Sequence, residues 1–166
     1  MCVPLGAHFL FWVFKMEIYR VAFIGHREIR DIRYVEDSIE KIALDLLYRY
    51  EFVEFNLGRN GDFDISSASA IKRAQKKYGT KNSSLNLILP YKSKDECFFQ
   101  EFYDEIYYPL NNKTHFKSAI KKRNEWLIDN SDLLVCYVKE NKLGGALKSL
   151  KYAQSKEIKI INLAIK

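Results

Sequence analysis

The sequence predicts an α/β fold, a three-layer sandwich in which helices cover both faces of a mostly parallel five-stranded sheet. Short apolar runs alternate with longer amphipathic segments along nearly the whole chain, and glycine or proline punctuates several of the junctions. Strands that alternate with helices are joined by right-handed crossovers, so the expected strand order is 3-2-1-4-5. The length of 166 residues and the apolar fraction of 48% suit one globular domain.

The first half of the chain predicts two strands and two helices. A strand is expected at 18–24, followed by a helix at about 29–48. Apolar residues recur in that helix three and four positions apart, as on one buried helical face: Ile32, Val35, Ile39, Ile42, Ala43, Leu46 and Leu47. The second strand is expected at 52–57, and a second helix at 63–78, where Gly79 ends it.

The second half continues the alternation after a long insertion. A third strand is expected at 85–89, ended by Pro90. The segment 91–116 is rich in aromatic and acidic residues, and we expect it to pack on the domain through a short helix, with one or two rings free to stack on a base. The remaining elements are expected in this order: the short helix at 94–104, a helix at 117–130, a strand at 133–138, a helix from Gly144-Gly145 to 156, and a strand at 158–163.

Composition limits the classes of function. The cysteines Cys2, Cys97 and Cys136 are odd in number and widely separated, so they predict no disulfide framework and no metal site, and a cytoplasmic location fits best. No cofactor is expected. The net charge of +6 indicates either a lysine-rich solvated surface or an anionic ligand such as a nucleotide or nucleic acid.

The apolar leader at residues 1–15 is too short to span a bilayer and lacks the features of a secretory signal. We expect it to be an upstream extension, with translation normally starting at Met16, so that 16–166 form a single domain without a membrane role. The alternative is a short segment that associates with a membrane or docks a partner.

Candidate site residues follow the strands of the predicted sheet. Ligands of such folds bind at the carboxyl ends of the strands, where the strand order reverses, here between the first and fourth strands. Gly25, His26 and Arg27 end the first strand. Their backbone N–H groups and the guanidinium favour a bound phosphate, with His26 lining the pocket or polarising a ligand oxygen. The alternative is a tight turn with a cation facing solvent.

A second turn follows the second strand and consists of Gly58, Arg59, Asn60 and Gly61. Asp62 is the expected N-cap of the next helix. Asp64 shares a helical face with Ala68 and Ile71, so its carboxylate must be paired or functional. It could bind ribose hydroxyls or act as a general base; the alternative is neutralisation by Arg59 or by a capping bond.

Two further groups of residues are candidates for the site, one within the helix at 117–130 and one after the strand at 133–138. Arg123 and Asn124 share a stripe with Ile120 and Leu127 that should be buried, which indicates that they line a pocket. Asp129 is a candidate partner of Arg27 or Arg123, and either Asp129 or Asp132 is expected to make local turn or capping bonds. Gly144 and Gly145 open a helix whose N-terminus suits phosphate, and Ser149 could add a hydroxyl.

In their order and spacing these motifs resemble the small GHR-motif proteins of the SLOG superfamily. The similarity covers about 19–163 and includes Leu89-Pro90-Tyr91 and Lys117-Ser118-Ala119-Ile120. It implies a Rossmann-like fold and a nucleotide or nucleotide-derived ligand. Members of the superfamily include phosphoribohydrolases, a single-strand DNA-binding protein and sensor domains of bacterial defence systems. Relatives often self-associate, so a homodimer is expected.

The chain departs from the phosphoribohydrolases at one motif. They carry Pro-Gly-Gly-x-Gly-Thr-x-x-Glu, whereas this chain lacks the second half of that loop and its glutamate between Lys142 and Ser149. The departure argues against glycosidic hydrolysis.

Three functions follow from these observations. The first is a cytoplasmic binding or sensor domain for a ligand such as ADP-ribose or NAD, in which Asp64 and Asn124 bond sugar hydroxyls and phosphate is held by Gly25, Arg27, Gly58, Gly144 and Gly145. The second is a nucleoside-monophosphate N-glycosidase, with Asp64 assisting water and Arg123 holding phosphate. The third is a single-strand nucleic-acid binder.

Overall fold

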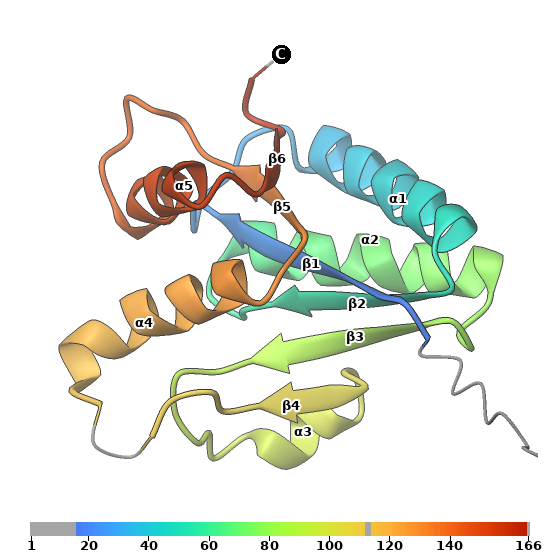
Figure 1. The fold of residues 1–166 in the computed structure, drawn as a ribbon, viewed down its shortest axis with the longest axis horizontal. Helices are drawn as coiled ribbons and strands as arrows, with labels where there is room; N and C mark the ends of the chain where they lie inside the picture. Colours follow the sequence, from blue (N-terminus) through green and yellow to red (C-terminus); the bar gives the residue numbers. More distant parts are fainter. Residues whose placement is uncertain (1–15, 112–113, 166) are drawn as a thin grey trace, which may run out of the picture.

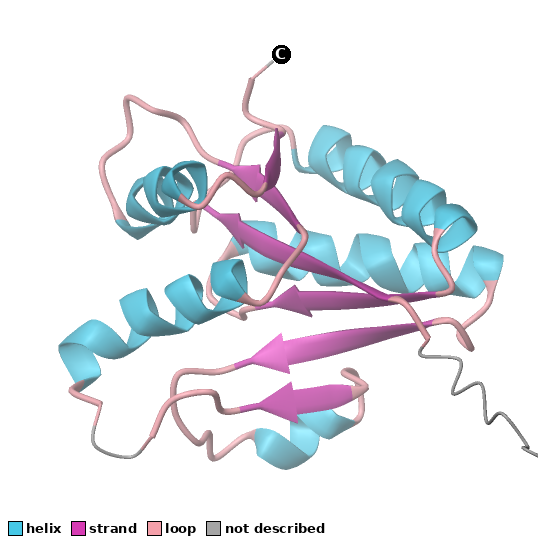
Figure 2. Cartoon of the chain, in the orientation of Figure 1, coloured by secondary structure: helices cyan, strands magenta, loops and turns pink. Residues whose placement is uncertain are grey.

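The computed structural model describes residues 16–111 and 114–165. The predictions about the leader at 1–15 therefore lie outside the described residues. The chain forms alternating strands and helices (Figures 1 and 2) in this order: β1 (Ile18–Gly25), α1 (Ile32–Arg49), β2 (Phe52–Leu57), α2 (Asp62–Tyr78), β3 (Ser83–Ile88), α3 (Glu96–Gln100), β4 (Glu105–Tyr107), α4 (Phe116–Asp129), β5 (Leu133–Tyr137), α5 (Gly145–Ser155) and β6 (Lys159–Asn162).

The strands form one six-stranded sheet in the order β4-β3-β2-β1-β5-β6. Every neighbouring pair is parallel, which confirms the predicted order of the five expected strands. The sixth strand, β4, was not expected. It has three residues and pairs with the edge of β3 inside the aromatic segment, where α3 spans only 96–100 instead of the expected 94–104.

Each face of the sheet carries its own core, because successive strand residues point to opposite sides. Val21 and Phe23 of β1 belong to the cluster formed with α1 and α2, whereas Ala22 and Ile24 belong to the cluster formed with α4 and α5. The strand is therefore buried on both sides, which explains its continuous apolar run. Fully burying one such large apolar side chain stabilises the fold by about 1.5–3 kcal/mol.

The strand order reverses between β1 and β5, which lie side by side. The chain leaves β1 toward α1 on one face and leaves β5 toward α5 on the other face (Figure 1). The two connections diverge at the carboxyl ends of these strands, and this divergence opens a crevice there.

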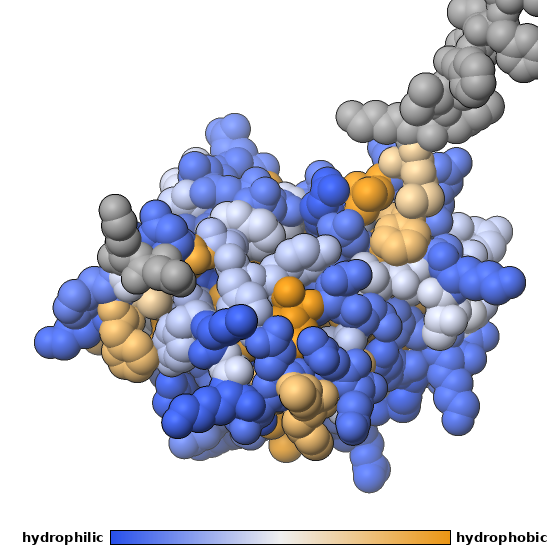
Figure 3. All heavy atoms as spheres, turned by 90° about the horizontal axis from the view of Figure 1, so that it is seen from below, coloured by the Kyte–Doolittle hydropathy of each residue, from blue (hydrophilic) through white to orange (hydrophobic). Residues whose placement is uncertain are grey.

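The surface beside the edge strand β4 is mostly hydrophilic. In Figure 3, apolar side chains on this face are scattered and are not gathered in one patch. Among the described helices, none has the length and apolar character needed to cross a bilayer.

Candidate functional site

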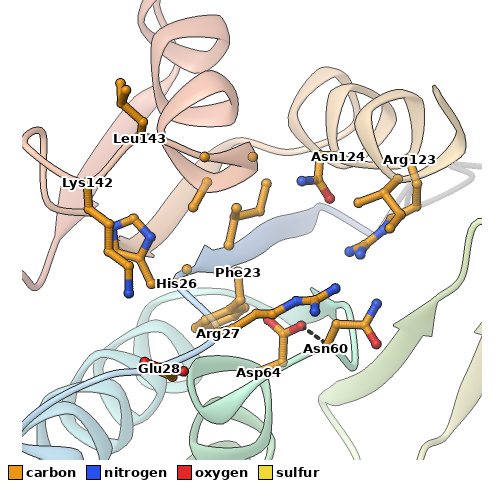
Figure 4. Close-up of a pocket in the computed structure, with 16 residues that line it drawn as sticks. Phe23, His26, Arg27, Glu28, Asn60, Asp64, Arg123, Asn124, Lys142 and Leu143 are labelled. Carbon is orange, nitrogen blue, oxygen red and sulfur yellow. Dashed lines mark hydrogen bonds between the residues drawn. The ribbon is translucent and has the colours of Figure 1, made fainter. Parts of the chain in front are cut away.

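A pocket of about 490 Å³ lies at the carboxyl ends of β1 and β5 (Figure 4). We call it the switch-point pocket. It is lined by residues of β1, of the loops after β1, β2 and β5, and of α2, α4 and α5. Most of the predicted site residues line it, namely Gly25, His26, Arg27, Asn60, Asp64, Arg123, Asn124, Gly144 and Gly145. Three other predicted residues, Gly58, Arg59 and Gly61, are not part of its lining.

Gly25 and Gly58 make room for protein side chains. A Cβ on Gly25 would lie 2.7 Å from the Cβ of Phe63, and one on Gly58 would lie 2.9 Å from Nη2 of Arg123. Both distances are shorter than real contacts, so a side chain at either position would displace its neighbour. The close approach that glycine allows here is between parts of the protein itself.

At Gly61 the loop after β2 packs closely against the loop after β1. Its φ is +123°, and a Cβ there would lie 2.9 Å from the carbonyl oxygen of Arg27. The next backbone N–H, of Asp62, donates to that same oxygen at 2.7 Å. The prediction that Asp62 is the N-cap of α2 is wrong, because Gly61 holds that position without a side-chain bond. The Asp62 carboxylate accepts instead from the Ile29 N–H at 3.4 Å.

Arg59 turns away from the switch-point pocket toward α3. Its guanidinium lies 3.7 Å from the Asp95 carboxylate and 4.0 Å from the centroid of the Phe99 ring. These contacts contradict the alternative that Arg59 neutralises Asp64. Sequence reasoning could not place them, because α3 approaches the turn only through the tertiary fold.

Asp64 is a buried carboxyl at the floor of the pocket, with a relative exposure of 8%. Its Oδ2 accepts a hydrogen bond from the Asn60 N–H at 2.8 Å, so the local capping bond considered from the sequence is present. Burial raises the pKa of Asp64 to about 6, although the positive charge of Arg123 and the Asn60 hydrogen bond act in the opposite direction. The group can therefore exchange a proton close to neutral pH.

Arg123 brings a buried cation to the same pocket. The side chain is 5% exposed, its Nε has no hydrogen-bond partner, and no carboxylate of residues 16–111 or 114–165 forms an ion pair with it. Burial lowers the pKa of Arg123, while the charge of Asp64 acts to raise it. Figure 4 shows its guanidinium and that of Arg27 extending into the pocket. A buried charge without a paired anion costs several kcal/mol, so this arrangement favours an anionic ligand.

His26 is held by the protein itself. Its Nε2 accepts a hydrogen bond from the Lys139 N–H at 2.9 Å, and its own backbone N–H donates to the Tyr137 carbonyl at 3.1 Å. Burial and the nearby charge of Lys142 lower the pKa of His26. The neutral imidazole therefore fixes the start of the loop between β5 and α5.

Gly144 and Gly145 differ from the other site glycines, because a Cβ at either one would meet no atom of a non-neighbouring described residue within 4 Å. Gly144 has a φ of +157° and caps α5 without a side-chain bond. The first N–H groups of a helix have no partner inside it. Open space therefore lies beside the free backbone N–H groups at the start of α5, where Gly144 and Gly145 line the switch-point pocket.

The aspartates near α4 do not reach the pocket. Asp129 accepts from the Tyr152 hydroxyl at 2.9 Å and pairs with Lys156 at 3.2 Å, so the suggested pairing with Arg27 or Arg123 is wrong. Asp132 accepts from the Arg20 N–H at 2.8 Å, a bond between the start of β1 and the residue before β5, and not the local turn or capping bond expected for one of the two.

Sequence reasoning missed several residues that line the pocket. They are Phe23, Ile24, Glu28, Ile120, Lys142, Leu143 and Ala146. Two of them had a usable signal: Lys142 and Leu143 directly precede the glycine pair that was expected at a strand end. Leu143 is 88% exposed and lies in the lining of the pocket.

Comparison with known proteins gives one informative likeness. No protein-family model and no curated protein matches the chain. Among solved structures, the molybdenum cofactor carrier protein of Chlamydomonas reinhardtii is similar, with a TM-score of 0.56 and 11% sequence identity over 89% of this chain and 78% of that protein. At this identity the likeness concerns architecture. The chain therefore has a Rossmann-like α/β fold. The pocket at its switch point between β1 and β5 is lined by four buried polar side chains, those of His26, Asp64, Arg123 and Asn124.

Proposed function

We propose that the protein binds a nucleotide or nucleotide-derived small molecule, such as ADP-ribose or NAD, in the switch-point pocket. The observation that carries the proposal is the buried guanidinium of Arg123, which lines the pocket without an ion-pair partner among the described residues. A phosphate would supply the missing negative charge. The exposed Arg27 at the mouth and the free amides at Gly144 and Gly145 would bind its remaining oxygens.

The other polar groups of the pocket suit a sugar. Asp64 and the Asn60 side chain lie beside the arginines (Figure 4) and offer oxygen acceptors to hydroxyl groups. A pocket of about 490 Å³ is within the usual range for small-molecule sites. The similar fold of a cofactor carrier is compatible with this role. A sensor role, a cytoplasmic location, a homodimer and membership of the SLOG superfamily are parts of the same proposal.

Thermal unfolding with added ligand tests the proposal. We expect ADP-ribose, NAD or AMP at 100 times its Kd to stabilise the protein by about 2.7 kcal/mol, which raises Tm by roughly 5–10 °C. Arg27→Ala should abolish the rise. Arg33→Ala is the matched control, because it removes another exposed arginine that does not line the pocket. If no nucleotide raises Tm, or if both variants respond equally, the proposal is wrong.

A second candidate, hydrolysis of the N-glycosidic bond of a nucleoside monophosphate, is favoured by Asp64. A buried carboxyl whose pKa is about 6 could act as a general base that takes a proton from the attacking water. Chromatography of a nucleotide panel after incubation should then show free base and ribose 5-phosphate, and Asp64→Asn should stop their release. Ligand binding without any release would leave the binding function alone.

A further inference from the structure

Two consecutive hydrogen bonds, the first buried and the second partly buried, link α4 to the start of α5. Nδ2 of Asn124 donates to the Ser149 hydroxyl at 3.0 Å, and the Ser149 hydroxyl donates to the Gly145 carbonyl at 3.0 Å. The exposures of Asn124 and Ser149 are 8% and 6%. Solvent therefore competes little for these groups, and the second bond ends at a glycine that lines the switch-point pocket.

The chain of bonds fixes which way the Asn124 amide faces. A serine hydroxyl has one hydrogen, and that of Ser149 is used on the Gly145 carbonyl. Toward Asn124 the hydroxyl can therefore only accept, so the amide must present its nitrogen to α5. The amide oxygen then faces away from α5, and this buried Oδ1 has no partner among the described residues. In Figure 4 the amide nitrogen of Asn124 lies on the side of α5.

From this geometry we infer that Asn124 selects a ligand that carries a hydrogen-bond donor, a sugar hydroxyl or an amino group, next to its anionic group. Asn124 and Arg123 are consecutive on α4 and both line the pocket. The inference rests on the proposed function, in which Arg123 holds a phosphate. A nucleoside 5′-phosphate carries both required groups on one sugar. Ser149 is the positioning residue, because it excludes the inverted amide that would present N–H groups to the ligand.

The same oxygen disfavours ligands that present only acceptors at this point. A phosphate or carbonyl oxygen facing Oδ1 would be repelled, and an apolar edge would leave a buried acceptor unpaired. Asn124 would thus set the orientation of the ligand as well as its identity, with the phosphate on the arginine side and the hydroxyl on the asparagine side.

The experiment compares AMP with 2′,3′-dideoxy-AMP by isothermal titration calorimetry. We expect the wild-type protein to bind AMP about tenfold or more tightly than the dideoxy compound, since losing one hydrogen bond while leaving a buried group unpaired has an effect of this size. Ser149→Ala should reduce the preference to near one by freeing the amide to turn. If Ser149 had a purely structural role, its loss would weaken the binding of both compounds equally and leave the ratio of their affinities unchanged.

Two further variants make the test specific. Ser67→Ala is the matched control, because Ser67 is also a buried helical serine whose hydroxyl donates to a carbonyl four residues earlier, that of Phe63 at 2.7 Å. It should keep the wild-type preference. Asn124→Ala should lose the preference, and adding Ser149→Ala to it should change the ratio no further, because Ser149 acts through Asn124.

The outcomes separate this inference from the proposed function. If AMP binds, but the ratio of the affinities for AMP and the dideoxy compound is the same in wild type and Ser149→Ala, the role of Asn124 and Ser149 is overturned and nucleotide binding stands. Binding of the dideoxy compound as tightly as AMP does the same. If neither compound binds while another nucleotide raises Tm, the donor-selecting role is overturned for sugar hydroxyls. If no nucleotide binds, the proposed function falls, and this inference falls with it.

Discussion

The guanidinium of Arg123 occupies the space that a side chain on Gly58 would need, with Nη2 only 2.9 Å from the position of a Cβ at residue 58. The residue that directly follows β2 therefore limits where the buried cation of α4 can lie. Gly58 therefore affects the position of the positive charge in the pocket, although it does not line the pocket itself.

Replacing Gly58 with alanine should lower affinity more than stability. The added methyl must push the Arg123 guanidinium aside, and this guanidinium is the far end of a flexible side chain beside the pocket, so its displacement costs little stability. Calorimetry with AMP or ADP-ribose should show weaker binding, and urea unfolding should show a midpoint close to that of the wild type. A Gly58→Ala protein with wild-type affinity would contradict the close approach.

Gly145→Ala is the contrasting variant. No atom of a non-neighbouring described residue lies within 4 Å of the added methyl, and Ala costs less than Gly in a helix by about 1 kcal/mol. We expect unchanged or slightly higher stability in urea, and a loss of ligand-induced stabilisation because the methyl fills the room beside the α5 amides. Retained ligand binding would show that the ligand does not approach this turn.

Arg123→Met should separate stability from binding. The substitution removes a buried charge that has no ion-pair partner in the described part of the chain, and it roughly keeps the side-chain volume. An unpaired buried charge carries a desolvation cost that no partner offsets, and the apolar side chain removes this cost. We therefore expect unfolding in urea at or above the wild-type midpoint and no Tm rise with nucleotide. Destabilisation well beyond ~2 kcal/mol would show instead that the charge contributes to folding.

Asp64 should make the stability depend on pH between about 4 and 7. Its pKa is raised from 3.8 to about 6 in the folded protein, so the folded state holds the proton more tightly than the unfolded state. The resulting stabilisation is complete below the unfolded value and is lost as pH rises through about 6. Roughly two pKa units correspond to about 3 kcal/mol.

Urea unfolding of wild type and Asp64→Asn at a series of pH values measures this effect. Asparagine does not titrate, so the stability of the variant relative to wild type should increase by about 2.4 kcal/mol from pH 4 to pH 7. A difference that stays constant across this range would show that the carboxyl titrates normally.

The charge of Lys142 should contribute to the lowered pKa of His26. Burial comes first among the causes that lower the pKa of His26, and the charge of Lys142 adds to it. Lys142→Ala should therefore raise this pKa, as measured from the imidazole proton shifts by NMR. The control is Lys148→Ala, an exposed lysine on α5 that is not among the groups acting on His26. Equal titration curves in wild type and Lys142→Ala would contradict the electrostatic contact.

The fold could be predicted from the sequence because its signals are local. Each long helix shows its buried stripe, and the buried β1 shows a continuous apolar run. Strand order followed from the alternation of strands and helices alone. The strand β4 escaped prediction because three residues with alternating exposure carry no periodic signal, and its pairing with β3 depends on the tertiary fold.

The site was predictable where chemistry conflicted with position. Asp64, Arg123 and Asn124 are polar residues on faces that should be apolar, and the structure brings all three to one pocket. Partners between distant elements could not be predicted, since they depend on packing. Arg59 contacts α3, and Asp129 contacts α5, because these elements happen to lie nearby. The direction of the Asn124 amide likewise depends on a hydroxyl from another helix.

The bonds that join the loops after β1 and β2 make one wall of the site a single stiff piece. The Arg27 carbonyl, the Asp62 N–H and carboxylate, and the Ile29 N–H hold it together. If the pocket adapts to a ligand of different size, the opposing wall must move, because Leu143 and the glycine pair there have open space around them. Engineering of ligand choice should accordingly begin in the loop before α5, and leave the paired loops untouched.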